Sequence, residues 1–496
     1  MKHLKIILSG LLILVAQEVK AQGYGGPLTF QGVNHTELHS VVARGMGGIA
    51  FRGTPDAASM FNQPAALERI RGLQLSVAGW WFSERLEQEQ NYAPVRYYPN
   101  LSLLLEGLTG KIPEPNPNLP GFTPADTVQR PYDDIGPNWT HSDNWQRPLH
   151  LMMAMPVTLG QLNLAAGAGV VAHADLHHYY QNNNVLYPSI LSQRPLPTPR
   201  PTDDNPLPVQ WYQTTRSREG AIWGYGFALA GTWDDKPVAF GVSGLLLRGS
   251  SDDFEQQVGR GRLTFFSNAF RADSAGWRLT RTGSSDFRGY ELNIGAVLSG
   301  RHVSLGLSVK PPSEIKRSYR TEQISLPQNL PAELQSALLG MPMDGEDRLR
   351  LPWRGTVALS VVPKERLVLA FEYEVRPYKS AKYVDARGIE SSPWLSSSPF
   401  RVGVECGVTP WLTLRGGMRS EAEVFEPEGN HLPGEPATYT AYALGLGIAR
   451  SGFRFDLALE HWEFKYQDIW SSAISKNVQK GLVVLGQVTY ELASQR

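Results

Sequence analysis

The sequence has one cysteine, no net charge and few long apolar runs, and each of these properties excludes some classes of protein. It contains one cysteine, Cys406, so no internal disulfide can form and disulfides play no part in the fold. Lys and Arg (47) balance Asp and Glu (47), and this net charge of zero gives no indication of a nucleic-acid partner. Beyond residue 21 no apolar run reaches the length of about eighteen residues that a membrane-spanning helix needs, which excludes helical spans.

The N-terminus carries the features of an export signal. Two lysines and a histidine lie in residues 1–5, an apolar run follows over residues 6–15, and Val19-Lys20-Ala21 supplies small residues at the usual cleavage positions. A run of about ten apolar residues is too short to cross a bilayer as a helix. We expect cleavage near Ala21, a mature chain beginning at Gln22 and no lipid anchor, because no cysteine lies near the cut.

Long segments of strict alternation are the main structural signal. Leu369, Phe371 and Tyr373 fall on one face of residues 366–376, whereas Glu372 and Glu374 fall on the other. Segments of about ten residues are long enough to cross a membrane as tilted strands. The same period of two recurs in residues 287–299, 353–361 and 453–460. Alternation alone is also typical of a soluble β-sandwich.

The spacing of the turns separates these two interpretations. Short connections lie near residues 160–161, 233–237, 299–302, 363–366, 409–410 and 450–452. Long polar stretches lie between them, at residues 83–148, 174–220, 249–285, 311–351, 379–399, 420–437 and 465–480. Regular alternation of short and long connections is typical of outer-membrane barrels, with short periplasmic turns and long external loops.

The fold class predicted is therefore all-β, a transmembrane antiparallel β-barrel of about fourteen strands. The strands are expected near residues 73–82, 149–159, 162–173, 221–232, 237–248, 287–299, 302–310, 353–362, 366–376, 400–408, 411–419, 438–449, 453–464 and 481–491. The expected organisation is a signal peptide (1–21), an N-terminal hatch (22–71) and the barrel (72–496). Thr54-Pro55-Asp56 predicts a helix start with a capping hydroxyl, and Pro64 predicts a second short turn. We expect this small helical hatch to lie inside the lumen.

One N-terminal motif carries a family resemblance. Residues 43–51 contain Gly45-Met46-Gly47-Gly48, residues 56–62 begin with Asp56 and end with Asn62, and Pro64 opens Pro64-Ala65-Ala66-Leu67. This pattern resembles the N-terminal hatch of the FadL family, the outer-membrane transporters of long-chain fatty acids and other hydrophobic compounds. The resemblance implies a fourteen-stranded barrel plugged by the hatch. It also implies passive, porin-like uptake of a hydrophobic small molecule, with no enzymatic activity and no cofactor.

The sequence also departs from the family pattern. Gln63 is inserted between Asn62 and Pro64, Ala66 replaces the usual glycine, and the chain ends on Arg496 rather than on an aromatic residue. Related barrels that act as shuttle or anchor proteins of secretion systems share much of the motif, so this function is the alternative. An outer-membrane lipid esterase is kept only as a minor alternative. The sequence contains no Gly-x-Ser-x-Gly elbow, the turn that exposes the nucleophilic serine in many esterases.

Other candidate sites are weaker. The glycines of the motif fit neither a P-loop nor a dinucleotide fingerprint, and their expected role is steric. His173, His177 and His178 with Asp175 could suggest a metal, but no further ligand spacing follows, and we expect solvated polar side chains. No catalytic, cofactor-binding or metal site is therefore predicted.

Two groups of side chains are assigned to the barrel wall. Ring residues near predicted strand ends are expected at the bilayer interface, namely Trp223, Trp233, Trp411, Tyr439, Tyr442 and Trp462. Charged residues on the polar faces are expected to point into the lumen and pair with the hatch, namely Arg354, Glu372, Glu374, Arg415, Asp456 and Glu460. We expect lipid outside this wall and a monomeric barrel in the cell outer membrane.

The third expected strand contains the small-residue stretch Ala165-Ala166-Gly167-Ala168-Gly169. Glycines within a strand weaken pairing and often mark bends. Members of the resembled family have an inward kink in this strand that opens the wall sideways, so Gly167 and Gly169 are the predicted lateral opening. The other interpretation is that the small residues make room for the hatch.

Overall fold

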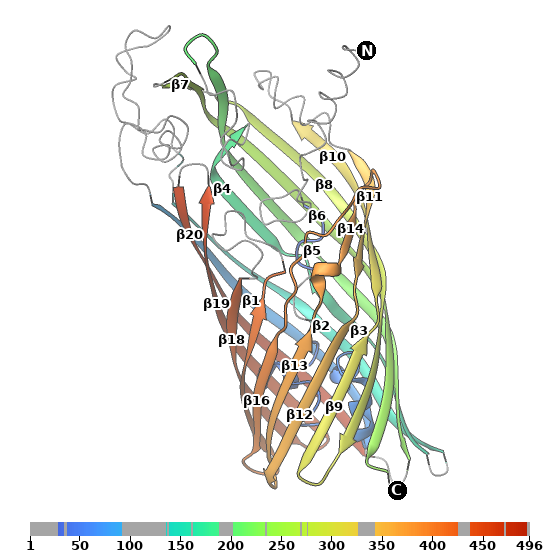
Figure 1. Cartoon of the computed structure of the whole chain (residues 1–496). Coiled ribbons are helices and arrows are strands. Elements are labelled where there is room, and N and C mark those ends of the chain that lie inside the picture. Colours follow the sequence, from blue (N-terminus) through green and yellow to red (C-terminus); the bar gives the residue numbers. More distant parts are fainter. Residues whose placement is uncertain are drawn as a thin grey trace.

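The computed structural model describes residues 28–33, 37–91, 135, 138–159, 162–187, 202–233, 236–267, 270–274, 276–325, 343–424, 437–470 and 473–493. In this part of the chain, one sheet of twenty strands curls into a barrel (Figure 1). The strand ends that the short turns join gather at one end of the barrel, and the strand ends that flank the long connections lie at the other. The expected signal peptide lies outside the described residues.

The barrel is closed and antiparallel, with fourteen strands in the ring. Strand β1 pairs with β20 from Gly72↔Ala493 to Asn91↔Ile474, which joins the two ends of the sheet. The antiparallel barrel of about fourteen strands predicted from the sequence is confirmed. The ring consists of β1 (Gly72–Asn91), β2 (Trp139–Leu159), β3 (Leu162–Asp175), β5 (Leu207–Trp233), β6 (Val238–Phe265), β8 (Arg278–Ser299), β9 (Val303–Lys310), β12 (Arg354–Lys364), β13 (Leu367–Val375), β16 (Phe400–Gly407), β17 (Leu412–Ala422), β18 (Thr438–Arg450), β19 (Phe453–Trp470) and β20 (Ala473–Ala493).

Side-chain alternation places apolar residues outside and polar residues inside. On β13, Leu369, Phe371 and Tyr373 are exposed by 45%, 41% and 41%. Glu372 and Glu374, which alternate with these residues along the strand, are buried. The same arrangement around the ring gives the barrel an exposed apolar band, the surface that a membrane barrel presents to lipid.

Several strands extend beyond their predicted ends. Strand β5 begins at Leu207 and β6 continues to Phe265, inside stretches expected to be loops. That part of the loop prediction was wrong, because polar residues predominate on both faces there and the regular alternation is lost. The backbone ladder between β5 and β6 satisfies the peptide groups by itself, and only its far end buries apolar side chains, at Val209, Trp211 and Phe265. Further strands at the same end are β4 (His178–Tyr187), β7 (Phe270–Ser274), β10 (Ser313–Ser325), β11 (Asp344–Leu351), β14 (Lys382–Val384) and β15 (Glu390–Ser391).

Residues 37–71 lie inside the barrel, drawn in dark blue near the turn end of Figure 1. The helices of this segment are α2 (Val41–Gly45), η1 (Ala57–Phe61) and η2 (Pro64–Arg69). A further turn, η5 (Tyr378–Ser380), follows β13. In the described part of the chain no helix combines the length and the apolar character needed to cross a membrane. We refer to residues 37–71 as the hatch.

Capping explains where the hatch helices begin. The Asp56 side chain accepts a hydrogen bond from Ala58 N and so caps η1, and the Thr54 hydroxyl donates instead to Glu405 (2.9 Å). The expected cap at Thr54 was therefore wrong by two residues. Pro64 begins η2, as predicted.

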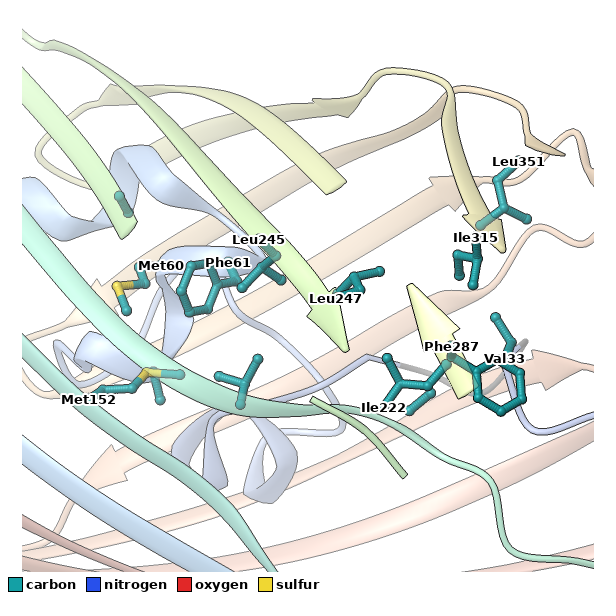
Figure 2. Packing of buried hydrophobic residues seen from close by; sticks show 14 of the residues in the cluster. Val33, Met60, Phe61, Met152, Ile222, Leu245, Leu247, Phe287, Ile315 and Leu351 are labelled. Atoms are coloured by element: carbon teal, nitrogen blue, oxygen red, sulfur yellow. The ribbon is translucent and has the colours of Figure 1, made fainter. Parts of the chain in front are cut away.

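Apolar packing holds the hatch against the wall. Figure 2 shows Met60 and Phe61 of η1 beside Leu245, with Met152 close by. Met60 and Phe61 are 0% and 1% exposed. Fully burying one such side chain contributes roughly 1.5–3 kcal/mol, so η1 is anchored mainly by the hydrophobic effect.

Candidate functional site

The glycines of the hatch motif allow backbone to meet backbone. A Cβ atom on Gly45 would lie 3.0 Å from Gly445 Cα, and one on Gly47 would lie 2.5 Å from Met418 N. Gly47 and Gly48 also have positive φ angles of 69° and 99°, which L side chains rarely adopt. Met46, between Gly45 and Gly47, is fully buried. These contacts support the steric role expected from the sequence.

The remaining motif residues tie the hatch together and to the wall. Asp56 accepts hydrogen bonds from the Ser40 hydroxyl and from Gln487 Nε2 (2.9 Å). The Asn62 amide donates to the Glu37 carbonyl (2.6 Å), which links two hatch segments. Pro64 packs against Gly241 of β6, where a side chain would collide with its carbonyl carbon.

The side chain of the inserted Gln63 contacts two strands of the barrel wall, β8 and β9. Its amide donates to the Leu307 carbonyl of β9 (3.3 Å). Its side-chain oxygen occupies the space left by the missing side chain of Gly295 on β8. The departure from the family pattern is therefore matched by a small residue in the opposite wall.

Ion pairs connect the hatch to the lumenal charges. Glu460 of β19 accepts from Arg44 of α2 (Nε–Oε1 2.9 Å) and from Arg419 of β17 (2.9 Å). Glu372 of β13 accepts from the backbone N–H groups of Ala50 and Phe51, both at 2.9 Å. These contacts agree with the expectation that the lumenal charges pair with the hatch.

A second polar network surrounds Glu37. Lys310 contacts Glu37 and Glu291, both at 2.6 Å, and Arg354 forms ion pairs with the same two carboxylates. Burial alone would raise the pKa of Glu37, but Arg354 and Lys310 hold it well below its usual value. The network therefore keeps Glu37 charged inside the barrel.

This network includes the one group of possible metal ligands in the described part of the chain, Glu37, His173 and Glu291. Lys310 and Arg354 already balance both carboxylates, so a divalent ion would be placed next to two fixed positive charges. Of the histidines considered in the sequence, His173 faces Glu37 (3.5 Å), whereas His177 stacks on Trp145 (3.8 Å). They do not converge on one site.

Aromatic side chains gather in the lumen beside α2. The rings form a chain of contacts, with centroid distances of 5.7 Å for Trp80–Phe82, 4.4 Å for Phe82–Trp145, 6.4 Å for Phe82–Trp462, 5.2 Å for Trp462–Tyr439 and 5.8 Å for Tyr439–Phe464. We call these six residues the lumenal aromatic cluster.

The lumenal aromatic cluster rests directly on the hatch. Trp80 and Phe82 pack against the apolar group that contains Val41 of α2, and the Arg44 guanidinium lies 5.9 Å from the centre of the Trp80 ring. Both rings are half-buried, not enclosed. The arrangement offers an apolar aromatic surface between the long connections and the hatch.

Two members of the cluster, Tyr439 and Trp462, were expected from the sequence to lie at the bilayer interface, and the structure places them elsewhere. Trp462 shares a strand face with the buried Glu460, and Tyr439 shares one with the buried Ala441, so both rings point into the lumen. Their assignment to the bilayer interface was wrong. Trp233, Trp411 and Tyr442 do point outward, exposed by 53%, 54% and 60%, and Trp223 is half-buried on the outer face.

The small-residue stretch of β3 has regular neighbours. Gly167 pairs with Ala154 of β2 and Ala228 of β5, and Gly169 pairs with Met152 and Gly226. A register shift occurs further along, between Ala172 and Ala174. A side chain on Gly167 would lie 2.7 Å from the Met60 sulfur, so this glycine gives the hatch room.

These features define a closed barrel plugged from its N-terminus, with an aromatic surface above the plug. The fold is similar to that of a FadL homologue from Pseudomonas aeruginosa, with a TM-score of 0.58 at 13% identity over 91% of this chain and 98% of that one. It is also similar to the toluene transporter TodX of Pseudomonas putida, with a TM-score of 0.50 at 13% identity over 93% and 100% of the two chains. No family model matches the sequence, and comparison with curated proteins finds no match. The resemblance indicated by the N-terminal motif is confirmed in the fold.

Proposed function

We propose that this protein is an outer-membrane channel for passive uptake of hydrophobic compounds such as long-chain fatty acids or hydrocarbons. The observation that carries the proposal is the lumenal aromatic cluster, which places half-buried rings on top of the hatch. Transfer of apolar surface out of water, at about 25 cal/mol per Å², supplies the free energy for binding. No catalytic group and no energy source are needed.

Two groups of ring contacts along β2 support a route from the external side. The Trp139 and Tyr179 rings lie 6.0 Å apart near the long connections, and Tyr179 stacks on His141 (3.6 Å). Further along β2, Trp145 contacts Phe82 of the cluster. We infer that a solute moves along these rings to the hatch and leaves after the hatch shifts.

Uptake by cells tests the proposal. A deletion strain complemented with the wild-type chain should take up labelled oleate or labelled toluene faster than the strain without it. The pair Trp80→Ala and Trp462→Ala removes two rings of the cluster and should lower this uptake several-fold. Trp411→Ala, which removes an outward ring of similar size, is the matched control and should leave uptake unchanged. Equal uptake with and without the protein, together with loss of a secreted surface protein, would instead favour the shuttle or anchor function.

We further propose that the cargo leaves sideways through the wall beside β3. Ala166, Gly167, Ala168 and Gly169 place no large side chain on either face of this strand. The pair Met153→Cys and Ala168→Cys, which are register partners on β2 and β3, would fasten the two strands by a disulfide. Oxidation should reduce uptake and a thiol reductant should restore it.

The control is a second engineered disulfide, placed between two other strands of the barrel wall. Val357→Cys and Tyr373→Cys are register partners on β12 and β13 and also face outward. Their oxidation should leave uptake unchanged. Full uptake by the oxidised Met153→Cys and Ala168→Cys protein would exclude an exit beside β3 while leaving the uptake function itself standing.

A further inference from the structure

A row of basic side chains crosses the outer surface of neighbouring strands near the long connections. It consists of Arg248, Arg288, Lys316, Arg348, Arg350 and Lys382, on β6, β8, β10, β11 and β14. The register places Arg248 opposite Arg288, Arg288 opposite Lys316, Lys316 opposite Arg348, and Arg350 opposite Lys382. We call these six residues the basic belt.

The basic belt faces away from the lumen. Leu247, Phe287, Ile315, Leu349 and Tyr383 are chain neighbours of the belt residues, and all five belong to the buried core. Because successive side chains of a strand point to opposite faces, the belt residues point outward. Arg248 and Arg288 are accordingly exposed.

The basic belt lies at the edge of the apolar band. On β6 the next outward residue toward the short turns is Leu246, exposed by 63%. On β8 the next ones are Tyr290, Leu292 and Ile294, exposed by 49%, 48% and 55%. The belt therefore borders the apolar band on the side of the long connections, where headgroups are expected to meet a barrel wall.

Part of the belt is electrically balanced within the protein. Arg350 lies 3.0 Å from Glu314, Arg348 lies 3.0 Å from Glu346, and Lys382 lies 3.1 Å from Glu390. The remaining belt residues, Lys316, Arg248 and Arg288, have no close carboxylate partner of their own among the described residues. Lys316 is 3.9 Å from Glu314, which Arg350 already holds more closely.

Arg248 and Arg288 form no ion pair within the described residues, although a carboxylate, Asp286, lies on the same face of β8. Like charges directly opposite each other on a sheet are destabilising unless something compensates them. The pattern thus calls for an external anion at Arg248 and Arg288, with Lys316 beside them.

We propose that Arg248, Arg288 and Lys316 bind the phosphorylated headgroup of a multiply acylated glycolipid in the outer leaflet. Arginine forks match phosphate oxygens in pairs of hydrogen bonds, and adjacent arginines can share one phosphate. The acyl chains of the same molecule lie against Leu246, Tyr290 and Leu292 below the belt. The inference rests on the proposed outer-membrane location but not on the identity of the cargo.

Native mass spectrometry of the full-length, detergent-solubilised barrel tests this site. The probe is lipid A, an acylated glucosamine disaccharide with two phosphates, compared with the same lipid after enzymatic dephosphorylation. The wild-type protein should bind the phosphorylated form at least tenfold more tightly than the dephosphorylated form. The double variant Arg248→Gln and Arg288→Gln should lose this preference, and Arg248→Lys with Arg288→Lys should retain part of it.

The matched control is Arg348→Gln with Lys382→Gln, which removes two belt cations that already have their own carboxylate partners, Glu346 and Glu390. It should keep the preference for the phosphorylated lipid. Equal binding of both lipids by the wild type, or unchanged preference in the Arg248 and Arg288 variant, would overturn the proposal. So would competition by equimolar inorganic phosphate, which would indicate a free-anion site. Heat-modifiable gel mobility verifies that each variant is folded, and solute uptake, measured separately, reports on the proposed function.

Discussion

At the scale of single residues, the motif glycines act by leaving out a side chain. Their chemistry could be predicted from the sequence, because the spacing fits no phosphate-binding loop and a crowded lumen needs close backbone approach. Their partners could not be predicted. Gly45 meets Gly445 and Gly47 meets Met418, and these contacts join residues hundreds of positions apart that only barrel closure brings together.

Gly47→Ala should destabilise the hatch. The new Cβ would meet the Met418 backbone, and the left-handed conformation adds about 1–2 kcal/mol of strain. The expected result is faster proteolytic cleavage within residues 37–71 of the folded barrel. Gly388→Ala is the control, because Gly388 also has a positive φ (82°) but open space around it. Equal cleavage rates in the two variants would contradict the role given to the Gly47–Met418 contact.

Glu460→Gln should weaken the attachment of the hatch, because it removes the carboxylate that pairs with Arg44. The change leaves Arg44 and Arg419 facing each other without their shared carboxylate, and breaking a buried pair from one side costs about 3–5 kcal/mol. We expect more hydrogen exchange at α2 and a lower thermal unfolding temperature. Glu463→Gln, on the same strand but only half-buried and paired with Lys465 and Lys480 rather than with the hatch, should change neither. If the two variants behave alike, Glu460 does not hold the hatch.

At the scale of elements, alternation predicts which strands exist better than where they end. The fourteen strands were predictable because each has an apolar outer face over a membrane thickness. Beyond that height polar residues predominate on both faces, so the continuation of β5 and β6 left no regular alternation to detect. The inward direction of Trp462 was detectable, since extending the alternation from Asp456 and Glu460 puts Trp462 on the same face.

A proline in the closing strand should prevent assembly. Val484 of β20 pairs with Trp81 on one side and Leu459 on the other, so Val484→Pro removes a ladder donor and strains a central strand. We expect loss of heat-modifiable gel mobility and little protein in the membrane fraction. Ser391→Pro in β15, which pairs only with β14 among the described strands, should leave assembly intact. A folded Val484→Pro barrel would argue against closure through β1 and β20.

At the scale of the whole molecule, the wall and the hatch are held by different forces. The wall closes on itself through backbone ladders from β1 to β20, and none of the described hatch residues contributes a strand to the ring. The hatch is held by burial of Met60 and Phe61 and by ion pairs such as Arg44–Glu460. The barrel should therefore stand without the hatch, whereas the hatch depends on the barrel.

Deletion of residues 45–67 tests this separation. The barrel should still fold and show heat-modifiable mobility, because the deletion removes no strand of the ring. Wall charges that now accept hydrogen bonds from residues 45–67, such as Glu372 and Glu405, would face water, which stabilises ions better than a dry interior does. The conductance of the purified protein in a planar bilayer should rise several-fold, and the rise should be larger than that caused by Glu460→Gln, which leaves the hatch in the chain. A folded deletion variant with wild-type conductance would mean that the external connections, and not the hatch, close the lumen.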